Sequence, residues 1–305
     1  MADPIITARG LRKSYGGREA VRGIDLEVRR GEIFAFLGPN GAGKTTTVEI
    51  LEGYRERSAG EISVLGEDPA DPSREWRERV GIVLQECRMQ PELTVRETVE
   101  LYAGYYRAPR PVAETLDLVG LAGSADVRAG KLSGGQQRRL DVALALIGDA
   151  ELLFLDEPTT GFDPSARRQA WDVIANLRDL GKTVFLTTHY MDEAQALADR
   201  ATIIVAGRIV ASGPPDRLGS DTPTTEIRFR LPDGVEVAEL PGDGADHDGR
   251  NVILRTGEPI RVLNELTAWA LERGVDLPGL DVGAPSLEDV YLELTGEAEA
   301  ESVAP

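Results

Sequence analysis

Short apolar runs alternate with stretches of helical periodicity along much of the chain. Continuous apolar runs, of the kind that form strands buried on both faces, lie at residues 33–37, 80–84, 152–155, 183–187 and 202–205. Helical patterns follow the first run, at 44–53, and separate the third from the fourth, at 165–180. Because strands that alternate with helices form parallel sheets, the pattern predicts an α/β core of the doubly wound type.

The first part of the chain has a different period. Residues 5–37 alternate apolar and polar positions around the turn-forming pairs Gly16-Gly17 and Arg30-Gly31. Alternation of this kind, broken by glycine turns, predicts antiparallel strands.

A third pattern predicts a helical subdomain at about 88–148. Thr94 and Glu97 have the spacing of a capping box and should open one helix. Ser133 should cap another, which carries apolar residues at helical spacing as far as Ile147.

Gly-Pro-Pro and a Ser/Thr/Pro cluster within 213–225 indicate a linker. Beyond it we expect paired strands at 226–231 and 251–255, an amphipathic helix at 260–273, and a final helix that opens at a second capping box, Ser286 to Asp289. The predicted domains are therefore 1–220 and a small α+β accessory domain at 221–305.

Composition narrows the classes of protein that this chain can represent. Its 305 residues are 41% hydrophobic and carry a net charge of −18, which disfavours binding to nucleic acid. No apolar run approaches the roughly 18 residues of a membrane-spanning helix, and the N-terminus has no signal-like core. The single cysteine, Cys87, excludes internal disulfides and cysteine-based zinc sites. A cytoplasmic protein is expected.

The first chemical motif, Gly38-Pro-Asn-Gly-Ala-Gly-Lys-Thr45, follows an apolar run and precedes a helical pattern. Backbone N–H groups of such a loop form an anion-binding concavity, and the helix directs its positive end at the same place. Lys44 would neutralise the β- and γ-phosphates of a nucleotide, and Thr45 would bind Mg²⁺. The predicted nucleotide-binding residues here are Gly38, Pro39, Asn40, Gly41, Ala42, Gly43, Lys44, Thr45 and Thr46.

The second motif is an acidic pair, Asp156-Glu157, directly after the apolar run 152–155. Open α/β sheets bind ligands at the carboxyl ends of their strands. Asp156 suits a Mg²⁺-bound water, and Glu157 is placed to deprotonate or orient the attacking water. Taken alone, such a pair is more often a helix cap or a solvated turn, but the phosphate loop favours the metal-site interpretation.

A third motif, Leu132-Ser-Gly-Gly-Gln136, lies between the other two. In this order the three motifs resemble the ATP-binding-cassette (ABC) ATPase family, and the resemblance covers residues 5 to about 218. It implies an ABC-type P-loop NTPase fold with a RecA-like core sheet, an antiparallel β subdomain and a helical signature subdomain. It also implies ATP hydrolysis in a head-to-tail dimer. The residues that one copy would contribute in trans to the other's ATP are Ser133, Gly134, Gly135, Gln136 and Asp163.

The resemblance assigns further residues one by one. Tyr15 stands where the family stacks an aromatic ring on adenine, and Gln85 matches the residue that touches Mg²⁺ and the attacking water. His189 matches the residue that contacts the γ-phosphate. Gly161-Phe-Asp163 matches the loop between subunits; Phe162 replaces the usual leucine, an apolar change that we expect to be harmless.

The amino-acid sequence at 49–54, 155–164 and 286–296 is similar to that of the daunorubicin-type drug-resistance ATPases, which work with ABC-2-type permeases. This similarity implies a separate integral membrane partner, a location at the cytoplasmic face of the membrane, and export of a drug-like or lipid-like compound. In the alternative hypothesis, the chain is a soluble ABC ATPase that acts on nucleic acid or ribosomes. Against it stand the absence of a coiled-coil insertion, of a second cassette and of zinc cysteines.

Two smaller features leave alternatives open. Asp243, Asp246, His247 and Asp248 could form a metal cluster, although an acidic hairpin loop is the simpler interpretation. Tyr102, Tyr105 and Tyr106 recur at helical spacing. Such stripes usually belong to a core, but here they could also line a groove for a membrane partner.

Overall fold

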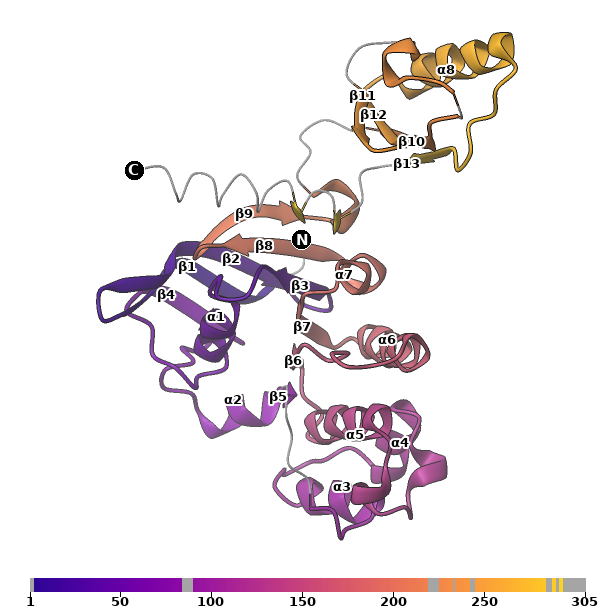
Figure 1. Ribbon diagram of the computed structural model, residues 1–305. Coiled ribbons are helices and arrows are strands. Elements are labelled where there is room, and N and C mark those ends of the chain that lie inside the picture. The colour runs from indigo at the N-terminus through magenta and orange to yellow at the C-terminus, as the bar shows by residue number, and fades with distance from the viewer. Residues whose placement is uncertain are drawn as a thin grey trace. The chain divides into compact units, whose positions relative to one another are not determined.

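A computed structural model describes the chain in several stretches (Figure 1), namely residues 3–83, 90–218, 225–232, 234–241, 245–283, 287–288 and 291–292. It divides the chain into a first compact unit that reaches Pro215 and a second that runs from Asp216 to Glu293. Gln85, Cys87, Asp243 and the capping residue Ser286 lie outside the described residues.

The core of the first unit is a six-stranded sheet in the order β5-β6-β7-β3-β8-β9. The strands span Val80–Val83 (β5), Leu152–Asp156 (β6), Thr183–Thr188 (β7), Ile33–Leu37 (β3), Arg200–Val205 (β8) and Arg208–Gly213 (β9). The first five are parallel, as predicted, but β9 runs antiparallel to β8. The antiparallel edge strand β9 was not among the predicted strands. Ala206 and Gly207 both have positive φ and form a two-residue hairpin, which joins antiparallel strands without a crossover helix.

Both faces of this sheet are buried because successive side chains of each strand enter different cores. Phe34, Phe154 and Phe185 pack on one face, with ring centroids 5.5 Å apart in both Phe34–Phe185 and Phe154–Phe185. Ile33 and Leu153 belong to the core on the other face. Full burial of such a side chain stabilises the fold by about 1.5–3 kcal/mol, so each strand is held from both sides.

Different elements cover the two faces (Figure 1). An antiparallel sheet of β1 (Pro4–Tyr15), β2 (Arg18–Arg29) and β4 (Ala59–Val64) lies with helix α1 (Lys44–Leu51) on one side. On the other side lie α5 (Gly134–Leu146), α6 (Pro164–Asp179) and α7 (Met191–Leu197). The short helix α2 (Arg74–Arg79) precedes β5. The two predicted anion-binding loops, at 38–45 and 132–136, therefore each lie at the start of a helix that packs against the same sheet.

The predicted helical segment contains α3 (Val95–Ala103), α4 (Val112–Leu118) and α5. The predicted capping box at Thr94 and the predicted helix cap at Ser133 are confirmed, and Ser133 also forms a capping box with Gln136. The tyrosines at helical spacing have different environments: Tyr106 packs against the core, whereas Tyr105 is 68% exposed.

The second unit is a small α+β domain. Its antiparallel sheet has the order β11-β12-β10-β13, formed by Ala245–Asp248, Asn251–Thr256, Thr225–Arg230 and Asp281–Gly283. Helix α8 (Pro259–Arg273) packs Leu266 on Phe229 and Leu254. The predicted pairing of the two longest strands is confirmed. The predicted acidic loop is wrong at 245–248, which is an edge strand paired with β12. Within the described residues, no group of three or more histidine, cysteine or acidic side chains is arranged to hold a metal ion.

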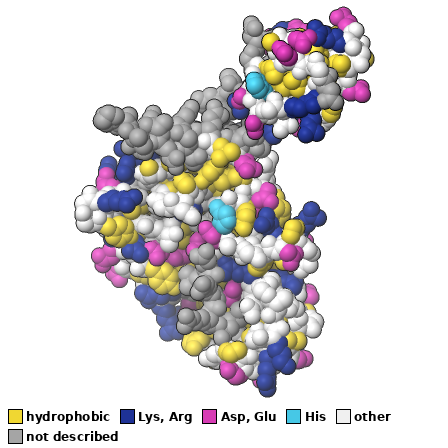
Figure 2. Space-filling model, viewed as in Figure 1, with side chains coloured by type: hydrophobic (Ala, Val, Ile, Leu, Met, Phe, Trp, Pro, Cys, Tyr) yellow, Lys and Arg dark blue, Asp and Glu magenta, His cyan; other side chains and the backbone are white. Residues whose placement is uncertain are grey.

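The surface carries charges of both signs. On the face shown in Figure 2, acidic and basic side chains are interspersed. None of the helices in the described stretches combines the length and apolar character needed to cross a bilayer.

Candidate functional site

The first glycine loop turns sharply between β3 and α1 because two neighbouring strands press against it. A Cβ atom on Gly38 would lie 2.2 Å from the carbonyl oxygen of Ile204. On Gly43, which has a φ of 106°, a Cβ would lie 2.5 Å from the carbonyl oxygen of Ala20. Only glycine fits at either position, and its absence of a side chain leaves the loop N–H groups open to an anion.

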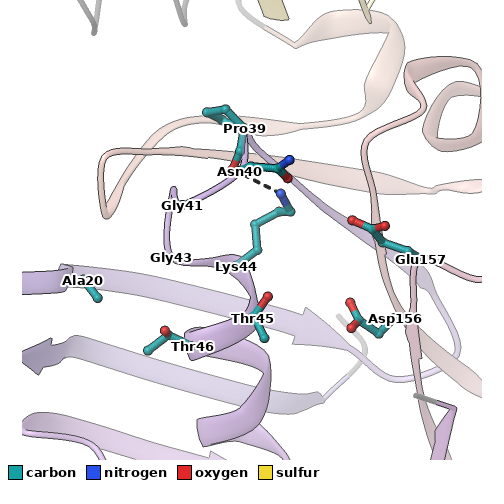
Figure 3. A pocket seen from close by; sticks show the side chains of 10 residues that line it. All are labelled: Ala20, Pro39, Asn40, Gly41, Gly43, Lys44, Thr45, Thr46, Asp156 and Glu157. Carbon is teal, nitrogen blue, oxygen red and sulfur yellow. Dashed lines mark hydrogen bonds between the residues drawn. The ribbon is translucent and has the colours of Figure 1, made fainter. Parts of the chain in front are cut away.

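The loop forms one wall of a pocket (Figure 3). Asp156 and Glu157, at the end of β6, lie on the opposite side from the loop. The pocket is lined by Ala20, Pro39, Asn40, Gly41, Gly43, Lys44, Thr45, Thr46, Asp156 and Glu157. The structure thus brings the two predicted motifs, more than a hundred residues apart, to the same place.

Ala20 is the lining residue that sequence reasoning missed. It lies on β2, and no local pattern distinguishes it, because it reaches the pocket only when β2 packs on the loop. Tyr15, at the end of β1, is not among the residues that line the pocket. Its ring instead lies beside two cations: Lys13 Nζ is 5.2 Å and the Arg55 guanidinium carbon 5.4 Å from the ring centroid.

Lys44 is nearly buried at the start of α1. Its Nζ donates to the carbonyl oxygens of Gly38, at 2.5 Å, and Pro39, at 3.2 Å. Burial lowers the pKa of the Lys44 ammonium, and the nearby carboxylates of Glu157 and Asp156 partly oppose this effect. An added anion at this position would stabilise the charged form further.

The acidic pair is held by β7. The hydroxyl of Thr187 donates to Asp156 Oδ1 at 2.5 Å, and the N–H of Glu157 donates to the Thr187 carbonyl at 3.1 Å. Glu157 has a φ of 45°, a left-handed conformation that costs a non-glycine residue about 1–3 kcal/mol. A carboxylate that is carried by a strained backbone and fixed by the adjacent strand is a typical feature of a functional site.

Two further groups contact the Glu157 carboxylate. The hydroxyl of Thr160 donates to its Oε2 at 3.1 Å, and Nδ1 of His189 lies 3.5 Å from the same oxygen. The structure therefore places the predicted His189 beside the predicted base.

A second pocket contains the other glycine motif. It is lined by Ser133, Gly134, Gly135, Gln136, Arg139, Gly161, Phe162, Asp163, Ser165, Ala166 and Gln169. Every residue predicted to act in trans is in this group. Among the described residues, it shares no lining residue with the first pocket.

The polar groups of the second pocket are arranged by helix starts. The hydroxyl of Ser133 accepts from the Gln136 N–H at 3.3 Å, and Asp163 Oδ1 accepts from the N–H groups of Ser165 and Ala166, both at 2.9 Å. Two helix N-termini, those of α5 and α6, thus meet at a concave surface that suits an anion.

Arg138 links the two motifs and was also missed by sequence reasoning. From the buried side of α5, it donates to the backbone carbonyls of Asp156, at 2.6 Å, and Pro158, at 3.2 Å. Its position beside the signature was visible in the sequence, but its partners depend on how α5 packs against β6.

Comparisons with known proteins agree with this geometry. The family described as "ABC transporter" matches residues 21–160, and "ABC transporter domain-containing protein-like, C-terminal domain" matches residues 225–286. The daunorubicin resistance ATP-binding protein DrrA3 of Streptomyces coeruleorubidus is 38% identical over 97% of this chain and 98% of its own length. The Nod factor export ATP-binding protein I of Rhizobium johnstonii is 39% identical over 95% of this chain and 94% of its own.

Solved ATP-binding cassettes share the fold. A dimeric post-hydrolysis structure of the cassette MJ0796, bound to ADP and phosphate, aligns with a TM-score of 0.60 and 25% identity, covering 68% of this chain and 98% of that one. The chain belongs to the ATP-binding proteins of the ABC transporter family. It is the ATP-binding subunit of such a transporter and hydrolyses ATP to ADP and phosphate. The predicted fold class and the predicted family are confirmed.

Proposed function

We propose that two copies of this chain pair head to tail around two ATP molecules and drive a separate ABC-2-type membrane permease. The observation that carries the proposal is the separation of the two pockets. One contains the lysine and the acidic pair, the other contains two helix N-termini, and neither has all the groups needed for ATP hydrolysis. In a head-to-tail pair, each first pocket faces the second pocket of the other copy. The dimeric state of the MJ0796 cassette supports this arrangement.

In the first pocket, the loop residues Gly38 to Thr46 would bind the triphosphate through their N–H groups. Lys44 would exchange its bonds to loop carbonyls for the β- and γ-phosphates. Tyr15, which is 42% exposed, would stack on adenine. In the second pocket, Ser133 to Gln136 and Asp163 would cover the ATP bound to the other copy.

A magnesium ion fits the donors present. The Thr45 hydroxyl and the Asp156 carboxylate are oxygen ligands that line the same pocket, and oxygen is what Mg²⁺ prefers. Bound there, the ion would neutralise charge on the phosphate oxygens. Gln85, the third predicted ligand, lies outside the described residues.

Glu157 would act as the general base and His189 would contact the γ-phosphate. The strained backbone of Glu157 and its contact with Thr160 restrict the directions in which the carboxylate can point. A base positioned in this way can accept a proton from a water molecule at the γ-phosphate.

The cargo would be a drug-like or lipid-like compound. Two similar relatives are described as a daunorubicin resistance protein and a Nod factor export protein, and both are matched over nearly their full length. These names favour export over the alternative of a soluble ATPase on nucleic acid or ribosomes. The permease would hold the chain at the cytoplasmic face of the membrane, and the exposed Tyr105 on the helical subdomain is a candidate contact.

An affinity pull-down tests this proposal. Glu157→Gln, tagged and expressed in the native host, is recovered from detergent-solubilised membranes with and without ATP, and its partners are identified. Recovery of an integral membrane protein in roughly equal amount is the expected result. Recovery of ribosomal or DNA-bound proteins without a membrane protein would contradict it.

A further inference from the structure

One short segment belongs to both pockets. Asp156 and Glu157 line the first pocket, residues 161–163 line the second, and only residues 158–160 separate them. Whatever holds this middle part therefore links one half-site to the other within the same chain.

A buried carboxyl group holds residues 158–160 in place through Thr159. Glu193, on α7, is fully buried, and its Oε1 accepts hydrogen bonds from the Thr159 hydroxyl at 2.8 Å and from Trp171 Nε1 at 3.1 Å. Thr159 is itself fully buried. Acidic side chains are almost never buried to this extent without a specific partner, so the contact is an unusual feature of the fold.

The other side of Glu193 is connected to His189. Helix α7 begins two residues after His189, and Thr188, the last residue of β7, lies beside the Glu193 carboxyl. Burial raises the pKa of Glu193, and the hydrogen bonds from Thr159 and Trp171 only partly oppose the rise. Hydrogen bonds in such a low-dielectric setting are strong and directional.

The segment that contains Glu157 and Thr159 is thus joined at two points to the segment that contains His189 and Glu193. Glu157 contacts His189, and Thr159, two residues after Glu157, contacts Glu193, four residues after His189. A displacement of residues 161–163 must pass through Thr159, whose backbone carbonyl accepts from Phe162 N–H at 3.1 Å. From Thr159 it reaches Glu193 and the start of α7, and with it His189.

We propose that Glu193 is a positioning residue that couples occupancy of the second pocket to the placement of His189 against Glu157 in the first. The inference rests on the proposed function, because it assigns the two pockets to two different ATP molecules. When the nucleotide of a second copy fixes residues 161–163, the Thr159–Glu193 hydrogen bond fixes the start of α7 and hence His189. The chain then hydrolyses its own ATP faster when its second pocket is also in use.

Matched variants test the coupling. Thr159→Val keeps the shape and removes the hydroxyl, Thr159→Ser keeps the hydroxyl, and Trp171→Phe removes the other hydrogen bond to the same oxygen. The kcat for ATP, the Kd of the monomer for ATP and the thermal unfolding midpoint are measured for each. We expect Thr159→Val to lower kcat by about tenfold, in line with loss of one buried hydrogen bond, with monomer ATP affinity unchanged. Thr159→Ser should recover most of the rate, and Trp171→Phe should lower the midpoint with little effect on kcat.

A double mutant separates coupling from a general loss of structure. If Glu193 transmits the state of the second pocket, Asp163→Ala should cost much less in a Thr159→Val background than in wild type. Additive losses, or losses of kcat that follow the unfolding midpoint in all variants including Trp171→Phe, would overturn the inference. A wild-type protein that neither dimerises with ATP nor hydrolyses it would instead contradict the proposed function.

Discussion

Nδ1 of His189 lies 3.5 Å from Oε2 of Glu157, across the neighbouring strands β7 and β6. In the proposed function, the pair joins the residue that would contact the γ-phosphate to the carboxylate that would accept a proton from water. Because each follows the carboxyl end of its strand, parallel pairing alone brings them together.

Glu157→Gln should retain ATP binding and lose turnover. The amide keeps the shape of the side chain but cannot accept the proton, and general base catalysis contributes roughly 10²–10⁴-fold. Phosphate release with Mg-ATP measures the loss, and size-exclusion chromatography should show an ATP-dependent dimer. Asp179→Asn, at the exposed end of α6, is a control that should hydrolyse ATP normally. A monomeric Glu157→Gln protein at saturating Mg-ATP would count against the sandwich arrangement.

Mixing two inactive variants tests whether the pockets act in trans. Lys44→Ala should fail to bind nucleotide, and Ser133→Arg should bind it as a monomer but fail to hydrolyse it. In a mixed dimer, one site has both defects and the other has none. We therefore expect an equimolar mixture to recover ATP-dependent dimerisation and part of the ATPase rate. No recovery of either, while both variants remain folded, would indicate that the two pockets serve one chain in cis.

Two glycines of the phosphate loop should differ in their tolerance of alanine. Gly41 has a φ of 80° with open space around its Cβ position, so Gly41→Ala should cost only the roughly 1–2 kcal/mol of a left-handed backbone. Gly43→Ala adds a clash with the carbonyl oxygen of Ala20 at 2.5 Å and must displace β2 or the loop. Titration with a fluorescent ATP analogue should show a larger loss of affinity for Gly43→Ala. Equal affinities would mean that β2 yields easily at this point.

Glu52 should make the nucleotide-free protein less stable as pH rises. Burial, reinforced by the charges of Asp156 and Glu49, raises the pKa of Glu52 to about 8 from the ordinary 4.5. Between these values the unfolded chain releases the proton while the folded chain keeps it, so folding loses stability with rising pH through this window. The full difference, reached above pH 8, is on the order of 5 kcal/mol.

Glu52→Gln removes that group and should unfold at higher urea concentration than wild type at pH 9, with a smaller difference at pH 5. Glu61→Gln is the matched control, because Glu61 is exposed on β4 and is not among the charges that raise the pKa of Glu52. Equal shifts of both variants with pH would show that Glu52 does not titrate as its burial implies.

Much of the fold followed from local patterns. The five predicted strands of the core sheet and the two helix caps at Thr94 and Ser133 are present, because apolar runs and cap spacing act over a few residues. The antiparallel β9 was missed, since a positive φ at Ala206 follows from the hairpin and is not indicated by alanine. The assigned roles of the site residues stay predictions until the variants above are measured.

The sequence by itself determined both anion-binding loops and the acidic pair, because each needs only contiguous residues: glycines that expose N–H groups, a helix start, or carboxylates after a strand. Only the tertiary structure decided which residues serve these loops from a distance. Ala20 closes the pocket from β2, Arg138 bonds the backbone of a residue 18 positions away, and Glu193 holds a hydroxyl 34 positions away. Such contacts depend on how helices and strands pack, and hydrophobic burial, not residue spacing, sets that packing.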